Sequence, residues 1–434
     1  MNEPILTDSG AVQETLEALP EALREPTRRK SSLFVILYGV SNLAIGMANI
    51  SLTAIMLPAQ IAPFVSRDQQ TSIYGLIVSL GAVAAVLTNL IAGALSDRTT
   101  SPLGRRRPWL IAGGVLTALL ALLLSFAPAL PIIVLEWVGL QIGINIIQAA
   151  VSSIVPDQIP IQQRATASAL TNGLGVMLGG LIGDILIAQV FPTVQGGYMA
   201  IAVGVVIALG LFFLVFRDMR MPKEYAPPLS TRKVLATFKP FAARDFLLVW
   251  LARCLVFLGY TTIVNFMFLF LQNAVHYTSL FPTQSTAQGV QTFFGLMVLS
   301  IIVGSLVGGI VSDKIGQRKP FIIVASGLLA LGLLIYAFFP IWGLVLAGTV
   351  VTGLGMGTYL AADLALASQV LPAAEDRGKD IGIMNTAIFL PMLVSPIIAG
   401  IILGALNSYL ILFVLLAIAA LGAAALILPI KSVR

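Results

Sequence analysis

Twelve apolar stretches, most of them 20 residues or longer, take up most of the chain. A helix needs about 20 such residues to cross the hydrocarbon core of a bilayer. Within lipid, a helix satisfies its backbone hydrogen bonds internally, which an irregular segment cannot do. The sequence therefore predicts an all-α membrane protein with twelve transmembrane helices. We expect these helices near 33–59, 72–96, 109–128, 131–155, 166–190, 197–216, 246–273, 290–311, 321–339, 341–370, 381–406 and 409–429.

The composition excludes an ordinary soluble protein. Hydrophobic residues make up 58% of the chain and charged residues 10%, whereas a soluble domain has about 25% charged residues. So few charges cannot cover a surface that faces water. The lipid bilayer is therefore the expected surroundings of the helices.

The positive charges are unevenly distributed along the chain. Of the 25 Lys and Arg residues, 23 lie in the N-terminal tail, the loops after even-numbered helices and the C-terminal tail, with Arg67 and Arg253 as exceptions. Positively charged loops stay on the cytoplasmic side. We therefore expect a multi-pass protein of the cytoplasmic membrane with both termini in the cytoplasm. The net charge of +6 then reflects topology, and we expect no nucleic-acid partner.

The chain repeats itself at about half its length. Ser96-Asp97-Arg98 returns 216 residues later as Ser312-Asp313-Lys314, and a Gly, a basic cluster and a Pro follow each copy, at 104–108 and 316–320. A duplicated half is typical of transporters built from two similar bundles. We expect two pseudo-symmetric six-helix bundles at 31–216 and 246–430, a flexible cytoplasmic tail at 1–30 and a cytoplasmic linker at 217–245.

Small residues spaced four apart recur in three of the expected helices. They are Gly175, Gly179 and Gly183 in the fifth, Gly304 and Gly308 in the eighth, and Gly400 and Gly404 in the eleventh. Such a spacing lets two helix backbones approach closely. We interpret these glycines as helix-packing positions.

The sequence lacks the motifs of nucleotide-driven or metal-dependent chemistry. It has no phosphate-binding Gly-Lys-Ser/Thr loop, no HExxH and no cluster of Cys and His. Its single cysteine, Cys254, cannot form an internal disulfide. We therefore expect no cofactor, no metal ion and no enzymatic activity.

The turn after the second helix resembles a known family signature. Residues 93–109, GALSDRTTSPLGRRRPW, are similar to the loop 2–3 signature of the major facilitator superfamily, and more narrowly to the glycoside-pentoside-hexuronide cation symporters and the sucrose-transporter group. Residues 309–320 resemble a weaker second copy, and 155–164 and 375–380 resemble the loops after helices 4 and 10. The resemblance implies the major facilitator fold and alternating-access transport of a small solute.

Two departures from relatives narrow this resemblance. Residues 71–96 contain no carboxylate, which argues against sodium coupling of the melibiose type, and residues 60–71 contain no histidine, which argues against plant-like sucrose recognition.

A set of charged residues at the cytoplasmic turns forms a candidate gate. Asp97 ends the second helix, where a carboxylate can cap the positive end of a neighbouring helix and pair with arginine. We name Arg164 and Arg105 as its candidate partners, with a purely topological role of the charges as the alternative. The candidate gate residues are Asp97, Arg98, Gly104, Arg105, Arg164, Asp313, Arg318 and Arg377.

Four ionisable residues lie within the expected helices and are functional candidates for ion coupling. Arg253 and Asp363 are each seven residues from the cytoplasmic end of their helices, which corresponds to a depth of about 10 Å. We predict that they form an ion pair or a proton-switched pair, with a purely structural bridge as the alternative. Glu136 and Asp184 match in depth nearer the outer surface, so they either share a proton or are solvated separately.

Polar residues form stripes on several apolar helices. Those on the first helix fall within an arc of about 60° at 100° per residue, and those on the fourth recur at spacings of 4 and 3. Such stripes face a wet cavity or, alternatively, bond to a neighbouring helix. The candidate substrate-binding residues are Tyr38, Asn42, Asn49, Gln141, Asn145, Gln148, Tyr260, Asn265 and Tyr359. Glu136 lies about 140° from the stripe on its helix, so we do not expect it to touch the solute.

These features together predict a monomeric secondary transporter for a small polar solute. Side-chain amides and hydroxyls suit a sugar or glycoside, and the carboxylates favour coupling to protons. A proton-coupled exporter of amphipathic compounds is the alternative, although Gly179-Gly180 lacks the following proline that such exporters often carry. A membrane sensor is disfavoured because no loop or tail is long enough for a folded soluble domain.

Overall fold

The computed structural model describes residues 26–168, 175–225, 243–315, 317–369 and 377–430. These residues form helices and connecting turns, without a strand. Eleven of the described helices are long and apolar enough to cross a membrane, and a shorter apolar helix covers Val176–Val190. The all-α prediction is confirmed. The predicted fifth helix, at 166–190, is described in part, because 169–174 lie outside the described residues.

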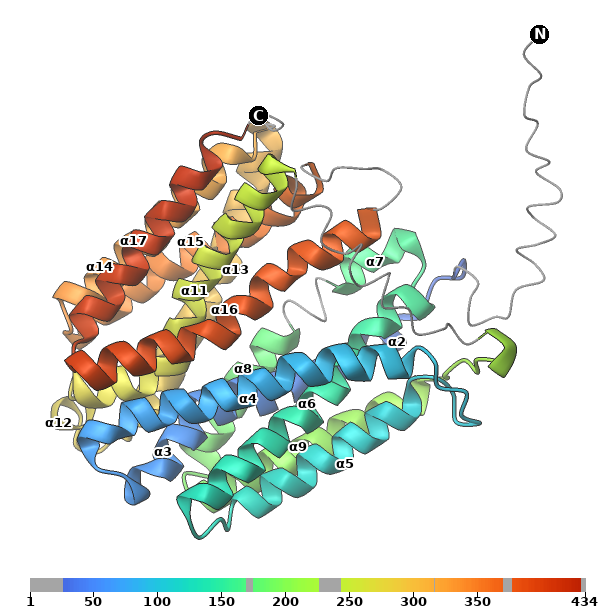
Figure 1. Ribbon diagram of the computed structural model, residues 1–434, viewed down its shortest axis with the longest axis horizontal. Helices are drawn as coiled ribbons and strands as arrows, with labels where there is room; N and C mark the ends of the chain where they lie inside the picture. Colours follow the sequence, from blue (N-terminus) through green and yellow to red (C-terminus); the bar gives the residue numbers. More distant parts are fainter. Residues whose placement is uncertain (1–25, 169–174, 226–242, 316, 370–376, 431–434) are drawn as a thin grey trace.

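The helices fall into two groups by their mutual packing (Figure 1). The first group contains α2 (Ser32–Gly46), the π-helical η2 (Met47–Met56), α3 (Leu57–Ile61), η3 (Ala62–Phe64), α4 (Arg67–Ser96), α5 (Arg107–Leu124), α6 (Leu130–Gln158), α7 (Ile161–Ser168), α8 (Val176–Ile185), η5 (Leu186–Val190) and α9 (Val194–Val215), followed by the short η6 (Lys223–Tyr225). The second contains α11 (Arg244–Asn273), α12 (Tyr277–Leu280), α13 (Thr286–Ile315), α14 (Lys319–Phe338), α15 (Trp342–Gln369), α16 (Arg377–Leu406) and α17 (Tyr409–Ile427).

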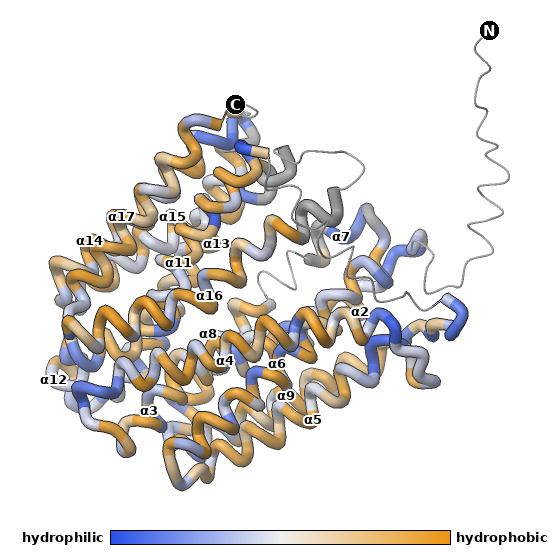
Figure 2. The backbone as a smooth tube through the Cα atoms, in the orientation of Figure 1, coloured by the Kyte–Doolittle hydropathy of each residue, from blue (hydrophilic) through white to orange (hydrophobic). Residues whose placement is uncertain are grey.

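Local sequence explains where several helices begin. Proline occupies the first turn of α5, α6 and α14, where its missing N–H group costs no hydrogen bond. The side chains of Thr193 and Ser408 accept hydrogen bonds from the backbone N–H groups of Gly196 and Ile411, which caps α9 and α17. The apolar interiors between these ends carry the hydrophobic colour of Figure 2, while the hydrophilic colour gathers near helix ends.

The predicted glycine contacts are confirmed. A Cβ atom on Gly179 of α8 would lie 2.2 Å from the backbone oxygen of Leu43 in α2, and one on Gly304 of α13 would lie 2.5 Å from that of Leu354 in α15. These helices therefore touch backbone to backbone, which a larger residue would prevent.

The two groups meet along α4 and α16, but at one end of these helices. We define the far end as the end where α4 begins at Arg67, and the basic end as the end where it stops at Ser96. Gly75 and Gly93 are 18 residues apart, which is five helical turns, so they share one face of α4. A Cβ on Gly75 would lie 2.8 Å from the backbone oxygen of Pro396, whereas no described atom lies within 4 Å of one on Gly93. The groups therefore touch at the far end and diverge toward the basic end.

Candidate functional site

Tyr74 joins the two groups of helices near the far end. Its side chain is fully buried, and its hydroxyl lies 2.6 Å from the backbone oxygen of Asn265 in α11 and 3.0 Å from that of Thr53 in η2. The ring of Phe266 packs edge-on at 5.2 Å. Sequence reasoning missed Tyr74, although a lone tyrosine in an apolar helix was a signal. From the second helix, Tyr74 thus contacts both the first and the seventh helix, near the predicted polar residues Asn49 and Asn265.

The structure divides the nine predicted substrate-binding residues by exposure. Half-buried are Asn49, Gln148, Tyr260 and Asn265, while Tyr38, Asn42, Gln141, Asn145 and Tyr359 are buried. Asn49 and Asn265 come from different groups, and both lie beside the Tyr74 contact, since Thr53 donates a hydrogen bond to the backbone oxygen of Asn49. The half-buried set is the part of the prediction that keeps exposed surface in this conformation.

Tyr38 instead belongs to the interior of the first group. Its hydroxyl donates to the backbone oxygen of Val151 in α6 at 2.9 Å, and its ring packs on Phe212 of α9 at 5.8 Å. The predicted shared arc for the first helix assumed α-helical geometry throughout. The π-helical η2 changes the rotation per residue from Met47 onward, so Tyr38 and Asn49 do not keep the expected common face.

Arg253 and Asp363 form the predicted ion pair. The guanidinium of Arg253 lies 3.1 Å from the carboxylate of Asp363, and their side chains are 7% and 4% exposed. Phe257 lies four residues after Arg253, and Tyr359 lies four residues before Asp363. Their rings meet edge to face, with centroids 6.2 Å apart. The guanidinium also lies 6.0 Å from the ring of Phe257. One Asp363 oxygen and one Arg253 nitrogen have no hydrogen-bond partner among the described atoms.

Glu136 and Asp184 do not form the pair that their matching depth suggested. Among the described elements, α6 packs mainly on α4 and α5, whereas α8 packs mainly on α2, η2 and α13. Glu136 is half-buried and lies near Tyr198, while Asp184 is fully buried. The two carboxyls therefore have separate surroundings.

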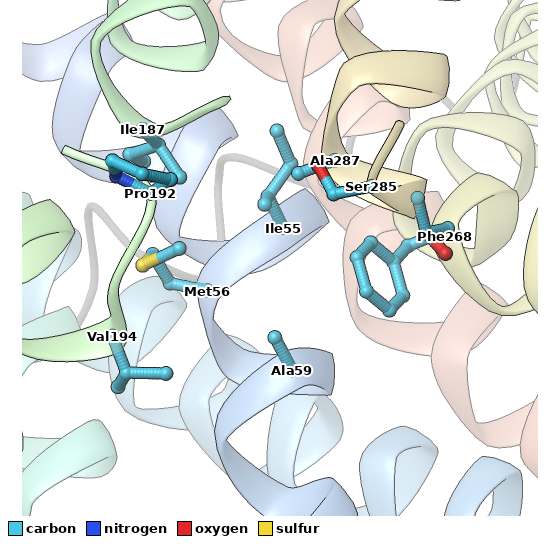
Figure 3. A pocket seen from close by; sticks show the side chains of 10 residues that line it. Ile55, Met56, Ala59, Ile187, Pro192, Val194, Phe268, Ser285 and Ala287 are labelled. Atoms are coloured by element: carbon cyan, nitrogen blue, oxygen red, sulfur yellow. The ribbon is translucent and has the colours of Figure 1, made fainter. Parts of the chain in front are cut away.

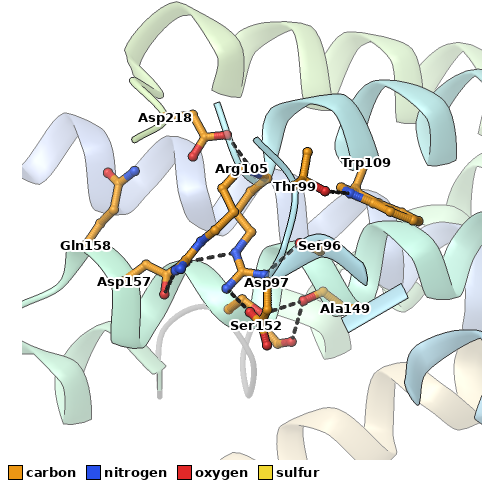
Figure 4. Close-up of polar contacts among 12 residues, drawn as sticks. Ser96, Asp97, Thr99, Arg105, Trp109, Ala149, Ser152, Asp157, Gln158 and Asp218 are labelled. Carbon is orange, nitrogen blue, oxygen red and sulfur yellow. Dashed lines mark hydrogen bonds and ion pairs between the residues drawn. The ribbon is translucent and has the colours of Figure 1, made fainter. Parts of the chain in front are cut away.

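Arg106 is the centre of a charge network at the basic end, and Figure 4 shows its partners Ser96, Asp97 and Asp157 together with Arg105. Its guanidinium lies 2.6 Å from Asp97 and 2.8 Å from Asp157, and it donates to the Ser96 hydroxyl at 2.6 Å. Arg105 pairs with the other oxygen of Asp157 at 2.6 Å. This network ties the ends of α4 and α6 to the start of α5.

The predicted partners of Asp97 are wrong. Asp97 pairs with Arg106, because Arg105 turns toward Asp157 instead. Arg164 donates to the backbone oxygens of Ile159 and Pro156, just beyond and within the last turn of α6. All the named partners of Arg106 belong to the first group, so, among the described residues, the network lies within one group.

The second group repeats the central contact of this network. Arg318 donates to the Ser312 hydroxyl at 2.7 Å, as Arg106 does to Ser96. The two arginines precede α14 and α5 with nearly identical dihedral angles, φ −101° and ψ −35° against φ −100° and ψ −33°. The predicted repeat therefore extends to backbone geometry. The side chains of Asp313 and Arg377 lie outside the described residues, and Arg98 follows the end of α4.

Gly104 and Asp218 hold the loop before α5 in place. Gly104 has φ +107°, and a Cβ there would lie 2.4 Å from the Asp218 carboxyl. That carboxyl accepts hydrogen bonds from the backbone N–H groups of Arg106 and Arg107, so it caps the positive end of α5. Burial raises the pKa of Asp218, and these backbone hydrogen bonds oppose the shift. Asp218 was missed because it comes from the segment after α9.

We expect Gly104→Ala to lower the free energy of unfolding by about 1–3 kcal/mol, the usual range for a non-glycine residue in a strained backbone conformation. Thermal unfolding in detergent measures this. Gly210→Ala is the matched control, since no described atom lies within 4 Å of its added methyl group. Equal unfolding temperatures for the two variants would contradict the role of Gly104.

A cavity of about 180 Å³ lies between the two groups at the far end (Figure 3). It is lined by Ile55, Met56, Ala59, Ile187, Pro192, Val194, Phe268, Ser285, Thr286 and Ala287. With two hydroxyl side chains in an otherwise apolar lining, it offers few partners for a polar solute. In the described ranges, no group of three or more His, Cys, Asp or Glu side chains could hold a metal ion.

Comparison with known sequences places this geometry among transporters. A sequence model of the Major Facilitator Superfamily matches residues 34–297 and 282–433. The chain is also similar to a general alpha-glucoside permease of Schizosaccharomyces pombe, at 28% identity over 144 residues, which cover 29% of this chain. The match spans about a quarter (26%) of the length of that permease.

Solved structures share the fold at low sequence identity. A bacterial homolog of the human lysosomal transporter Spinster, in an inward-facing and unoccupied conformation, has a TM-score of 0.64 at 17% identity, with 92% of this chain and 93% of that chain covered. A mutant of the nucleoside transporter NupG has a TM-score of 0.73 at 11% identity, covering 92% and 99%. A POT family transporter in complex with a thioalcohol-conjugated peptide has a TM-score of 0.68 at 16% identity, covering 91% and 94%.

Proposed function

Since the chain belongs to the Major Facilitator Superfamily, and is thus a multi-pass membrane transporter and not an enzyme, we propose that it moves a sugar or a glycoside together with protons. The observation that carries this proposal is that Asn49 and Asn265 come from different groups of helices, are both half-buried, and lie near the contacts of the Tyr74 hydroxyl with the backbone of Thr53 and Asn265. Amides both donate and accept hydrogen bonds, as a hydroxyl-rich neutral solute requires. The partial similarity to a glucoside permease supports the same solute class.

The proposed mechanism is alternating access between the two groups. In this conformation α4 and α16 touch at the far end, and Gly93 faces no described atom near the basic end. We assign the basic end to the cytoplasm on the basis of its arginines and lysines. The solute then enters or leaves the Asn49 and Asn265 site from the cytoplasmic side, while the Tyr74 contact closes the path to the other side.

The buried ion pair gives this mechanism an electrostatic element. Arg253 and Asp363 lie on α11 and α15, in the group that contributes Asn265. A buried pair is stable only while both partners remain charged and in contact. We propose that solute or proton binding changes this contact during the cycle.

Counterflow of labelled sugars in proteoliposomes tests the proposed solute class. We expect Asn265→Ala and Asn49→Ala to raise the KM for the transported sugar about fivefold each, since a hydrogen bond is worth about 1 kcal/mol and 1.4 kcal/mol corresponds to about a tenfold change. Asn273→Ala is the control on the same helix, because Asn273 lies at the far end of α11 next to Tyr409. Counterflow of amphipathic compounds but of no sugar would favour the exporter instead.

A further inference from the structure

Asp184 is a buried carboxyl without a charged partner. Its side chain is 0% exposed, and neither of its oxygens has a hydrogen-bond partner among the described atoms. It lies in α8, which together with η5 forms the described part of the predicted fifth membrane helix. Leaving an ionised carboxylate in such a place costs several kcal/mol or more, so a group of this kind is neutral unless a countercharge is near.

The elements packed on α8 supply no countercharge within their apolar lengths. Residues 32–56 of α2 and η2, residues 186–190 of η5 and the undescribed stretch 169–174 contain no charged residue. The titratable side chain of α2 is Tyr38, whose hydroxyl is bound to Val151. In α13 the charged residues Asp313 and Lys314 belong to its last turn, far from Gly295, which faces Leu181 of α8. On the neighbouring α9, the Tyr198 hydroxyl donates to Gln60.

The other carboxyls within the membrane helices differ in this respect. Asp363 has the guanidinium of Arg253 at 3.1 Å, and Glu136 is half-buried. These two can hold a negative charge in the present conformation, whereas Asp184 has neither a cation nor solvent.

We propose that Asp184 is the proton-binding site of the transport cycle, protonated in this conformation and ionised when α8 moves against η2. This inference rests on the proposed proton-coupled transport and names the residue that carries the proton. The glycines of α8 make the carboxyl sensitive to such a movement. Gly179 touches the backbone of Leu43, and Gly183 touches the hydroxyl of Ser51, so a small shift of either helix changes what surrounds Asp184.

Ser51 can change its hydrogen-bond partner when Asp184 loses its proton. It lies in the middle of the π-helical η2, beside the Asp184 carboxyl, and donates its one hydroxyl hydrogen to the backbone oxygen of Gly180 at 2.8 Å. The lone pairs of its oxygen remain free to accept from a protonated carboxyl. When Asp184 is ionised, the Ser51 hydroxyl turns to donate to the carboxylate and leaves the Gly180 carbonyl.

The surroundings suit a proton better than a metal cation. Hard cations such as Ca²⁺ and Mg²⁺ take about six or more oxygen ligands. The residues that the α8 glycines touch, Leu43, Met47, Ile50 and Ser51, bring one hydroxyl group. A proton requires one carboxyl oxygen and one acceptor, which Asp184 and Ser51 provide.

The test uses full-length protein in proteoliposomes with a pH-sensitive dye inside and labelled sugar. We expect Asp184→Asn, which mimics the protonated carboxyl, to keep counterflow within about twofold of the native protein. The same variant should lose accumulation driven by a pH gradient and lose sugar-dependent dye acidification. Asp68→Asn, a change at an exposed position in the first turn of α4, is the control and should retain all three activities.

The outcomes separate this inference from the function on which it rests. Native protein that shows sugar counterflow but no sugar-dependent proton movement, or accumulation driven by sodium alone, overturns proton coupling itself. Native proton movement that persists in Asp184→Asn overturns the assignment of Asp184. If Asp184→Asn fails to fold, Ser51→Ala decides. It should move the pH midpoint of driven uptake upward by about one unit, because the ionised carboxylate loses its donor. An unchanged midpoint overturns the proposal.

Discussion

Replacing Arg253 by leucine should destabilise the protein by about 3–5 kcal/mol and abolish transport, because the Asp363 carboxylate would remain buried without its partner. The two side chains are 7% and 4% exposed, so water cannot compensate for the loss. Asp363→Leu should have a similar effect, since it leaves the guanidinium uncompensated. This is the largest stability change that we expect from any single substitution in the membrane helices.

The double variant Arg253→Leu with Asp363→Leu is the matched control. It removes both charges together, and replacing a buried ion pair by apolar residues is often neutral or stabilising. We expect it to unfold near the native temperature in detergent, while uptake stays absent if the pair works in the cycle. Normal uptake by the double variant would reduce the pair to a structural bridge, and normal uptake by both single variants would contradict any role.

Valine at Gly75 should open the far end and close the basic end. Its side chain would meet the backbone of Pro396 and Gly400 at 2.8–2.9 Å, and backbone atoms cannot move aside as a flexible side chain can. Valine at Gly93 should be accepted in the present conformation, because no described atom lies within 4 Å, but should block closure of the basic end. Both variants are expected to lose at least 90% of uptake. Gly75→Val does so because the far end cannot close, and Gly93→Val because the basic end cannot close.

Distances between spin labels distinguish these two effects. Cys254 is the single native cysteine, so Cys254→Ser gives a background without thiols. Labels on exposed positions at the far end (Gln69→Cys with Thr278→Cys) and at the basic end (Leu103→Cys with Gln317→Cys) report the separation of the two groups. Gly75→Val should lengthen the far-end distance and shorten the basic-end distance. Gly93→Val should keep the far-end distance short and the basic-end distance long. The same change in both variants would contradict the model of one shared α4 face.

The sequence predicted the helices well because lipid imposes a simple rule of length and hydrophobicity. Helix ends were less accurate: α11 begins at Arg244, two residues before the predicted start, since Arg244 and Asp245 fit a first helical turn at the membrane surface. Matching depth and opposite charge, with the resemblance to a family in which helices 7 and 10 line the central cavity, predicted the contact between Arg253 and Asp363. Matching depth without opposite charge failed for Glu136 and Asp184.

The polar sites that depend on local backbone geometry could not be predicted in the same way. Three consecutive arginines are equivalent in sequence, and the turn at Gly104 decides that Arg106, and not Arg105, faces Asp97. The π-helical η2 likewise altered the faces of Asn49 and Thr53. Tyr74 and Asp218 act through contacts between segments distant in the chain, for which one sequence carries no periodic signal.

The Arg106 network has a consequence for the speed of the cycle. Asp97, Asp157 and Ser96 all travel with Arg106 on the first group, so these bonds need not break when the two groups rotate as rigid bodies. The activation barrier of reorientation is then set elsewhere, where Tyr74 must release the backbone of Asn265 and Gln189 must release Gln291. Both are hydrogen bonds between neutral groups, so their release leaves no charge unpaired in the membrane.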